Sequence, residues 1–579
     1  MFSYCQQLKS VNLSGFSPIE SSDFSHMFSY AEKLTSIDLS SFSTKSARNM
    51  QYMFQNAKSL TQINLSKFET NEVYDMQGMF VDCKKLESLD LSSFNTENLL
   101  NMKSMFLACP VLKTINFGDF DANKVTSMES TFERCISLES LDLSKFKTQN
   151  VISFIATFSD CTSLTSLSLS NFKTNKATDM NNMFKNCNKL EYLDVSNFDT
   201  SNVIKMNNMF QECSELTSID VSKFDTSKVT DMSLMFNKCT KLKFLDVRNF
   251  KTQNVVVIGN MFSDCVSLTS LDVSNFVTSN VESLNSMFKN CISLKSLDVS
   301  RFITTKVTMM TSLFAQCSNL TSLSLRNFDT SKVFSISYMF DGCKSLRYLE
   351  IGNFNSELFR DTSSMFRNCE SLTSLDLSSW KTDSLYSMNA MFKGCKSLQI
   401  LKLDKIETGA VIDMGELFSG CENLKSLDLK GFDTSMVGTM EHMFDSCSTL
   451  TSLDLSRFDT NWNKKFNYMF NNCTNLQSIE ISKLDTSNIN DMSFMFNGCT
   501  SLTELNLKNF NTGNVISMKS MFSSCKNIHS LDLSSFNTQK CNDFEDMFAQ
   551  VDNMVVKVNS NNCKNMVDAI KGSVTIEDQ

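Results

Sequence analysis

Proline, glycine, histidine and tryptophan are scarce in this 579-residue chain, which contains 2 Pro, 15 Gly, 3 His and 2 Trp. Glycine and proline normally form the turns of globular domains, and 2 + 15 = 17 such residues are too few for several domains. The three histidines have no partners at catalytic spacing, and no phosphate-binding glycine loop is present. The sequence therefore predicts one large, repetitive folded object that is not an enzyme.

Long apolar runs and an excess of positive charge are also missing. The longest aliphatic run covers residues 255–258, which is far too short to cross a bilayer. The first seven residues do not form a secretory signal, and the last six carry no sorting motif. The formal charge of 54 − 63 = −9 argues against a globally basic nucleic-acid binder. We predict no membrane span and no nucleic-acid partner, and export stays open because a signal or anchor could lie outside this sequence.

A repeat of 26 residues fills almost the whole chain. Phenylalanine recurs at every twenty-sixth position from Phe2 to Phe548, and (548 − 2)/26 = 21 intervals give 22 copies without insertion or deletion. Cysteine follows this Phe by three residues in 19 of 22 repeats, and leucine-like residues follow it by six, nine and eleven. A second Phe comes fourteen residues after the repeat Phe in 18 of 21 repeats. Thr comes sixteen residues after the repeat Phe, also in 18 of 21 repeats. Self-similarity of this kind is typical of solenoids.

Each repeat contains patterns for two kinds of local structure. The Leu residues at nine and eleven enclose one outward residue, which is the alternation of a short strand. The later Val, Met and Met-Phe spacing places apolar side chains on one face of a short helical segment, which the Thr would cap, with a short 3₁₀ turn as the alternative. We expect an α/β solenoid, a right-handed leucine-rich-repeat-like coil stack with a parallel sheet on the concave side and short helical segments on the back.

The domain organisation follows from where the repeat stops. We expect residues 1–548 to form a leucine-rich-repeat solenoid of about 21–22 coils with a 26-residue period. Residues 549–579 depart from the pattern and are expected to form a C-terminal cap, with a short helix ending at Gly572 and an extended stretch over 573–577. The first coil has no equivalent cap. Truncation at the N-terminus is one interpretation, and an end-to-end contact through this uncapped coil is the other.

The repeat resembles the BspA-like leucine-rich-repeat surface protein family, in the branch with 26-residue units. The matching text is LTSIDVSKFDTSKVTDMSLMFNKC over residues 216–239, and the resemblance covers about residues 1–548. It implies a leucine-rich solenoid of microbial cell surfaces, with roles in adhesion and protein binding and no enzyme activity. The absence of a visible export signal or anchor departs from this expectation.

The numerous sulfur-containing residues are explained by packing. Nineteen cysteines share one column of the repeat, with Cys541 and Cys563 outside it. Ala31, Ala57 and Val551 occupy the same column, and these residues preserve packing but cannot pair or bind metal. Paired CxxC spacing is absent. We therefore expect buried free thiols that act as small apolar residues, and no metal site or cofactor.

The outward strand position, ten residues after the repeat Phe, is rich in acidic residues. It holds Asp in 12 of 21 repeats, and five of these are consecutive: Asp194, Asp220, Asp246, Asp272 and Asp298. Like charges about 5 Å apart in water repel by roughly 0.8 kcal/mol, so other interactions must offset this stripe. One interpretation is a carboxylate stripe for calcium or a basic partner, and the other is a solvated face that keeps the sheet soluble.

Residues that break the repeat are the remaining candidates for binding. The outward positions on either side of the Asp column are mostly Ser, but the exceptions are aromatic, aliphatic or basic: Tyr192, Phe244, Tyr348 and Ile400 on one side, Arg248 and Arg326 on the other. Aromatic and Arg side chains are typical of binding hot spots, although drift in a tolerant repeat would also produce them. Phe244, Asp246 and Arg248 are expected to lie side by side in one coil.

Two functional hypotheses follow. The first is a non-enzymatic protein-interaction solenoid, a surface or adhesin-type module that binds a protein partner through its concave Ser/Asp face. The second is an intracellular or assembly-embedded architectural scaffold. The location is the cell surface or extracellular space by resemblance, and the cytoplasm if Met1 is the native start. The candidate binding residues are Tyr192, Asp194, Asp220, Phe244, Asp246, Arg248, Asp272, Asp298, Arg326 and Tyr348.

Overall fold

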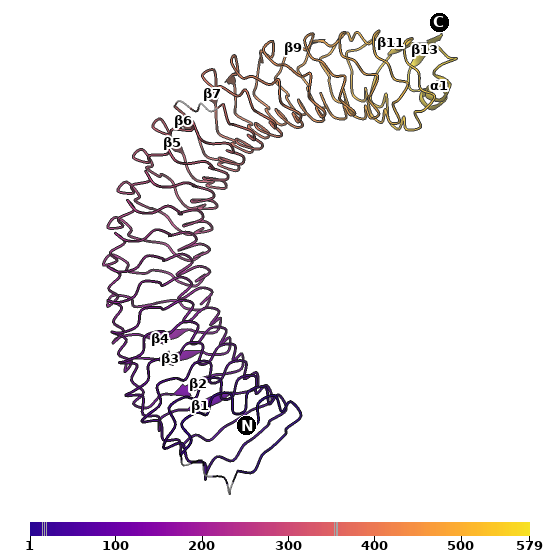
Figure 1. The fold of residues 1–579 in the computed structure, drawn as a ribbon. Helices are drawn as coiled ribbons and strands as arrows, with labels where there is room; N and C mark the ends of the chain where they lie inside the picture. The colour runs from indigo at the N-terminus through magenta and orange to yellow at the C-terminus, as the bar shows by residue number, and fades with distance from the viewer. Residues whose placement is uncertain (14–15, 17, 19, 353, 355–356, 579) are drawn as a thin grey trace. The chain divides into compact units, whose positions relative to one another are not determined.

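The protein is a solenoid of parallel coils whose period is fixed by the backbone pairing. The structure, a computed structural model, describes residues 1–13, 16, 18, 20–352, 354 and 357–578. Parallel bridges join residues 26 apart, as in Asp23 with Asn49 and Asn49 with Asp75. Figure 1 shows the successive coils from the N-terminus to the C-terminus. The predicted parallel-strand β-solenoid is therefore confirmed.

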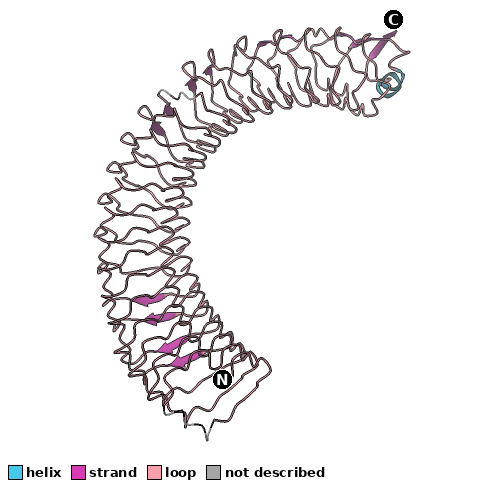
Figure 2. Ribbon diagram, in the orientation of Figure 1, coloured by secondary structure: helices cyan, strands magenta, loops and turns pink. Residues whose placement is uncertain are grey.

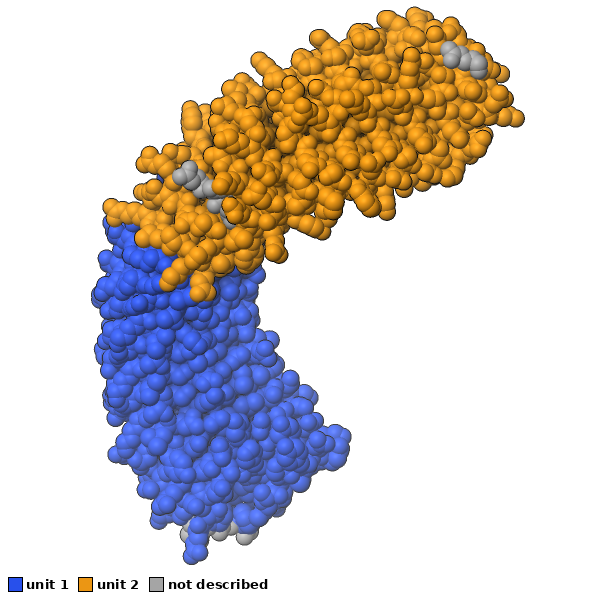
Figure 3. Space-filling view, turned by 45° about the horizontal axis from the view of Figure 1, so that its top comes forward, with its two compact units in different colours: residues 1–281, 287–297 blue, residues 282–286, 298–579 orange. Residues whose placement is uncertain are grey.

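The coils are grouped into two compact units (Figure 3). Unit 1 comprises residues 1–281 and 287–297, and unit 2 comprises residues 282–286 and 298–579. This division falls inside the repeat array. The predicted boundary between a solenoid over 1–548 and a cap over 549–579 stays a prediction.

The strands are short and lie where the Leu-x-Leu pattern predicts them. In β1 (Ser88–Asp90), Leu89 is buried between two exposed residues, and it pairs with Ile115 of β2 (Thr114–Asn116) in a parallel register. Unit 1 also contains β3 (Ser140–Asp142) and β4 (Ser166–Ser168). Unit 2 contains β5 (Ser322–Ser324), β6 (Tyr348–Glu350), β7 (Ser374–Asp376), β8 (Ile400–Lys402), β9 (Ser452–Asp454), β10 (Ser478–Glu480) and β11 (Ser530–Asp532).

The C-terminal segment continues the sheet with irregular elements. Strand β12 (Val555–Val558) pairs with β11 and with β13 (Thr575–Asp578), so the three strands form one parallel sheet. Helix α1 (Lys564–Ile570) joins β12 to β13 and buries Met566 and Ile570 (Figure 2). Gly572 follows the helix with φ of 91°, a conformation that favours glycine. The short helix and extended stretch agree with the sequence prediction.

The predicted helical segments on the back of the coils are wrong. Among the residues described, α1 is the only α-helix. The back consists of consecutive tight turns, in which Ser104 and Ala108 adopt positive φ of 56° and 59°. The N–H groups of Ser104, Phe106 and Ala108 donate to carbonyl oxygens of the next coil at 2.8–2.9 Å, whereas an α-helix would keep these bonds within the segment. Hydrogen bonding between coils therefore replaces the helix.

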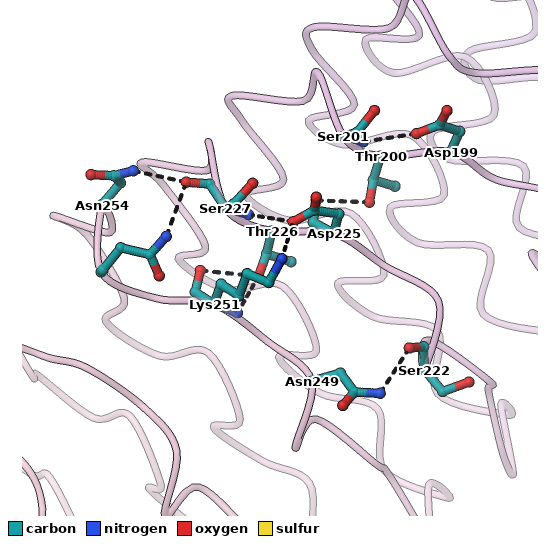
Figure 4. Close-up of polar contacts among 11 residues, drawn as sticks. Asp199, Thr200, Ser201, Ser222, Asp225, Thr226, Ser227, Asn249, Lys251 and Asn254 are labelled. Atoms are coloured by element: carbon teal, nitrogen blue, oxygen red, sulfur yellow. Dashed lines mark hydrogen bonds and ion pairs between the residues drawn. The ribbon is translucent and has the colours of Figure 1, made fainter.

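The Thr side chains that recur once per repeat do not cap helices as was expected but form hydrogen bonds to the next coil. Thr226 donates from Oγ1 to the carbonyl oxygen of Lys251 at 3.1 Å and accepts the Lys251 N–H at 2.7 Å. Figure 4 shows this pair and the bond from Thr200 to the carbonyl of Asp225, at 2.9 Å. The Thr side chain thus joins successive coils at a point where the backbone does not pair directly.

Asp and Asn side chains form the corners of the coils. In one coil, Asp220, Asp225 and Asp231 each accept the backbone N–H of the residue two positions later, at 3.0, 3.0 and 2.9 Å. This Asx-turn arrangement substitutes for the local geometry that Gly and Pro otherwise supply. Corners stabilised by side chains, up to three in one coil, help to explain why the chain needs so few of those residues.

The core contains stacked columns of Phe and Cys. The repeat Phe rings of successive coils stack at 5.4–6.0 Å, for example Phe80 on Phe106 at 5.9 Å. The thiol of Cys109 donates to the carbonyl oxygen of Phe80 at 3.0 Å, and the same contact recurs through the column. All the cysteines are free, and only Cys5 is exposed among those described. The thiols therefore both fill the core and satisfy a carbonyl of the preceding coil.

The expected concave position of the sheet is wrong within unit 2. His442 and Tyr468 stack at 4.4 Å on the turn side, Phe444 and Phe470 at 5.6 Å in the core, and Phe302 and Phe328 at 6.4 Å next to the strands. In these examples, which come from different coils, the ring spacing increases from the turn side to the strand side. Figure 2 shows the strands of this unit on the outer side of its bend. The dense hydrogen bonding of the turns holds that side at its minimum spacing, so the strand side is the convex one.

Candidate functional site

The strand face carries the exceptional residues that the repeat pattern singled out. Tyr192 and Phe244 in unit 1 are 67% and 65% exposed, and Tyr348 in β6 is 75% exposed. Most of the surface of these large side chains is in contact with water and is not packed against neighbouring residues. The same column is otherwise mostly Ser, so these side chains protrude from a flat, small and polar surface.

The acidic column has a local structural role in every coil of the predicted stripe. Asp194 and Asp220 accept the N–H groups of Ser196 and Ser222, at 2.9 and 3.0 Å. The hydroxyls of these serines, followed by their backbone N–H groups, lower the pKa of both carboxyls. Asp272 and Asp298 make the same contact with Ser274 and Ser300. Turn stabilisation thus accounts for the column, and the carboxylates remain exposed and ionised.

Asp246 and Arg248 form a pair within one coil. The Arg248 guanidinium donates from Nε to Oδ1 at 3.0 Å and from a terminal nitrogen to Oδ2 at 2.7 Å. These side-chain bonds, with the Arg248 backbone N–H, lower the pKa of Asp246 to about 2. Arg248 is therefore paired within its own coil, and Phe244 is exposed two residues before Asp246. The expected side-by-side arrangement of the three residues is present.

The structure brings together seven of the ten candidates on four successive coils of unit 1. Tyr192, Asp194, Asp220, Phe244, Asp246 and Arg248 lie on three successive coils of unit 1. Asp272 lies on the next coil of that unit. Arg326 and Tyr348 occupy neighbouring coils of unit 2, where Ser324 of β5 is in register with Glu350 of β6. Asp298 also belongs to unit 2 and lies one coil before Arg326 in the sequence.

A second exposed stripe lies outside the residues that were singled out from the sequence. Tyr74, Leu100, Ile152 and Ile204 share one column six residues before the repeat Phe and are all exposed. Backbone bonds join this column from coil to coil, as from the N–H of Leu100 to the carbonyl of Tyr74 at 2.9 Å. In the sequence, an inward Val or Leu alternates with an outward aliphatic residue, and this alternation could have predicted the stripe. It was missed because the segment was interpreted as a helix.

Chemistry at the cysteines is suppressed by burial. Desolvation raises the pKa of Cys161, Cys213 and Cys265 to about 12, so these thiols stay protonated at neutral pH. Across the described part of the chain, no group of three His, Cys, Asp or Glu residues could hold a metal ion. Within the same residues, no helix combines the length and apolar character needed to cross a bilayer.

The fold defines a class of protein, the parallel-strand β-solenoids. More specifically, the chain belongs to the family described as "Mycoplasma protein of unknown function, DUF285". The family model matches residues 1–115, 110–218, 186–297, 286–401, 390–480 and 464–577. Together these overlapping matches cover residues 1–577 without a gap.

Three of the solved structures that are similar to this chain come from bacteria. A leucine rich cell surface protein from Faecalibacterium prausnitzii is 17% identical, with 68% of this chain and 83% of that chain covered and a TM-score of 0.27. A leucine-rich-repeat protein from Bacteroides ovatus is 17% identical, with 85% and 87% covered and a TM-score of 0.23. The functional domain of InlJ from Listeria monocytogenes, which includes a cysteine ladder, is 15% identical, with 90% and 74% covered and a TM-score of 0.17. No curated protein matches the chain.

Proposed function

We propose that this protein is a non-enzymatic protein-interaction solenoid of the surface or adhesin type, and that it binds protein partners through its strand face. The observation that carries the proposal is the protrusion of Tyr192, Phe244 and Tyr348 from a surface of Ser and Asp. Aromatic anchors surrounded by small polar residues are typical of the residues that dominate binding energy.

Because the strands of unit 2 lie on its convex side, the surface available to a protein partner there differs from the concave face that the sequence suggested. A convex strand face presents its side chains outward and separated, so a partner reaches each exception without entering a groove. Arg248 lies on the strand face of unit 1 and Arg326 on that of unit 2, and each supplies a charged group on a face that also carries aromatic residues. The proposal is therefore a strand-face module, in place of the concave-face module that the sequence suggested.

Binding to a displayed random-peptide library tests this function. The immobilised protein is expected to enrich peptides, and the triple variant Phe244→Ala, Arg248→Ala, Tyr348→Ala is expected to lose most of that binding. The matched control is Ser88→Ala, Ser140→Ala, Ser322→Ala, which changes the same face at ordinary repeat positions. Enrichment that is equal for the wild type and the first triple variant, or no enrichment at all, would contradict the proposal.

A further inference from the structure

Tyr192 and Phe244 enclose a slot on the strand face of unit 1. They lie in the same column on alternate coils, and the coil between them carries Ser218 at that position. Ser218 is paired with Phe244 by a parallel bridge, and the N–H of Thr217 donates to the carbonyl of Glu191 at 3.3 Å, which places Ser218 beside Tyr192. Two strand spacings, about 10 Å, separate the two large residues. A small residue therefore forms the floor between two exposed aromatic walls.

The slot has the width of one unbranched side chain. A group placed midway lies about 5 Å from each wall, within the distance of about 6 Å at which a cation is attracted to an aromatic ring. Unit 2 contains the same arrangement six repeats later, with Ser374 between Tyr348 and Ile400. A surface hollow of about 500 Å³ is lined there by Ser374, Leu375, Ile400 and Lys402, among others. Tyr348 is not among the residues that line this hollow, so the hollow shows only that a small residue beside a large one leaves a depression on this face.

The side of the slot in unit 1 is acidic. Asp194, Asp220 and Asp246 occupy the next outward column on the same three coils as Tyr192, Ser218 and Phe244. Asp246 is paired with its own Arg248. Asp194 and Asp220 each accept a serine N–H, and the nearby Lys223 ammonium, which donates to the carbonyl oxygen of Ser196 at 3.4 Å, also lowers the pKa of both carboxyls. Among the contacts described, Lys223 forms no ion pair with either carboxylate. These two carboxylates keep acceptor capacity on the solvent side. A slot with aromatic walls and a carboxylate edge is complementary to a basic side chain.

We propose that the Tyr192–Phe244 slot binds an arginine or lysine side chain from an extended, basic segment of a protein partner. The inference rests on the proposed function, and it specifies the partner chemistry at one site of the strand face. The aliphatic part of the side chain lies over Ser218 between the rings, and its cationic end reaches Asp220 and Asp194. Arginine binds more tightly than lysine because its planar group both stacks on rings and pairs with carboxylates.

The equivalent slot in unit 2 differs in charge and provides an internal comparison. Its acidic column contains Glu350, Asp376 and Lys402, and Lys402 contacts Asp376 at 2.9 Å. One of its walls is Ile400, which has no aromatic face for a cation. This slot therefore lacks the two features that select a basic side chain, and we assign the cation preference to unit 1 only.

Three capped pentapeptides test the chemistry directly: Thr-Val-Arg-Val-Thr and the versions with norleucine or glutamate at the centre. NMR titration of the full chain is expected to show binding of the arginine peptide about tenfold tighter than that of the norleucine peptide, and no binding of the glutamate peptide. The arginine δ-methylene protons are expected to shift upfield, because they lie between two rings. Equal affinity for the arginine and norleucine peptides would overturn the proposed cation preference.

Filling the slot with a larger side chain distinguishes specific binding in the slot from nonspecific apolar binding to the strand face. Ser218→Tyr closes the slot and adds apolar surface, so the arginine peptide is expected to lose at least about tenfold in affinity. The matched control is Ser140→Tyr in β3, which adds the same surface between Thr114 and Ser166, where no slot exists. Unchanged or tighter binding by Ser218→Tyr would overturn the proposal. Ser374→Tyr is expected to leave arginine-peptide binding unchanged, and a loss there would overturn the assignment to unit 1.

The carboxylate contribution has its own pair of variants. Asp220→Asn keeps an acceptor for the Ser222 N–H and removes the charge, so it is expected to lower the affinity for the arginine peptide several-fold. Asp142→Asn makes the same change outside the slot, where Asp142 contacts Ser144, and is expected to have no effect. Equal effects of the two variants would overturn the acidic contact. If library binding depends on Phe244 and Tyr348 but the arginine peptide does not bind, the proposed function stands and this inference fails.

Discussion

The Thr226 hydroxyl and the Lys251 backbone form a reciprocal pair between coils: Oγ1 donates to the carbonyl at 3.1 Å and accepts the N–H at 2.7 Å. Thr226 is fully buried, so water cannot replace either bond. The same exchange recurs between other coils, as from Thr434 to Asp459, at 2.8 Å in each direction. One hydroxyl per coil therefore carries part of the main-chain pairing that holds the stack together.

Replacing Thr226 by Val removes this pair and keeps the shape of the side chain. The Lys251 N–H and carbonyl lose their buried partner, and we expect the free energy of unfolding to fall by about 1–3 kcal/mol. Hydrogen exchange at the Lys251 amide should accelerate. Thr269→Val is the control, since Thr269 is exposed and makes only a 3.4 Å bond to Lys243. A similar loss of stability in both variants would contradict this role of Thr226.

Alkaline pH should destabilise the solenoid through its buried thiols. Burial raises the pKa of Cys213 to about 12, whereas an unfolded thiol titrates near 8.5. The folded state prefers the neutral thiol, so its stabilisation is complete below about pH 8.5 and is lost as the pH rises towards 12. Each such thiol should contribute a slope of about 1.4 kcal/mol per pH unit in that window.

Denaturant unfolding at several pH values between 8 and 10.5 measures this slope. The double variant Cys213→Ala, Cys265→Ala should show a shallower slope, because two titrating groups are removed. A stability that does not change over this range, or rapid modification of the folded protein by a thiol reagent at pH 8, would rule out the buried-thiol explanation.

Substitution by glycine should stabilise the protein at turn positions with positive φ and destabilise it at positions with negative φ. Ala108 has φ of 59°, where a side chain costs roughly 1–2 kcal/mol relative to the right-handed region. Ala108→Gly relieves this cost, and after the entropy lost by glycine we expect a net gain of about 0.5 kcal/mol. Ala410, an exposed alanine without positive φ, is the control, and Ala410→Gly should lose about 0.5–1 kcal/mol. Thermal unfolding of both variants compares the signs directly.

The corner carboxylates should tolerate amides better than apolar residues. Asp220→Asn keeps an acceptor for the Ser222 N–H, whereas Asp220→Ala removes it and should cost roughly 0.5–1 kcal/mol. The lowered pKa of Asp220 means that its contribution is present above the unfolded value and declines as the pH falls through the folded value. Solvent screening makes that acid effect small. Equal stability of the Ala and Asn variants at pH 7 would refute the turn role.

The sequence predicted the strand face better than the back of the coil. The alternation around Leu89 correctly placed an inward Leu between outward residues, and the fixed 26-residue spacing correctly placed residues such as Ser88 and Thr114 side by side. The prediction failed for the segment around Ser104 and Ala108, because Val, Met and Met-Phe at spacings of three, three and one also suit consecutive turns. Sequence periodicity cannot distinguish a bond within the segment from a bond to the next coil.

The candidate site was predicted residue by residue but not as a surface. Phe244 and Arg248 were singled out as exceptions to the repeat, and both lie exposed on the strand face. The slot between Tyr192 and Phe244 was not foreseen, since it depends on the ordinary Ser218 between two exceptional residues. The pairing of Arg248 with Asp246 likewise required side-chain geometry.

The sequence alone determined the period, the buried columns and the residues that protrude, because each follows from apolar side chains repeated at fixed intervals. Only the tertiary structure decided that the back is made of turns and that the strand face of unit 2 is convex. The physical reason is that each of these features depends on hydrogen bonds between coils. Such bonds join residues about 26 positions apart, as from Phe106 to Thr131, and exist only once neighbouring coils are stacked.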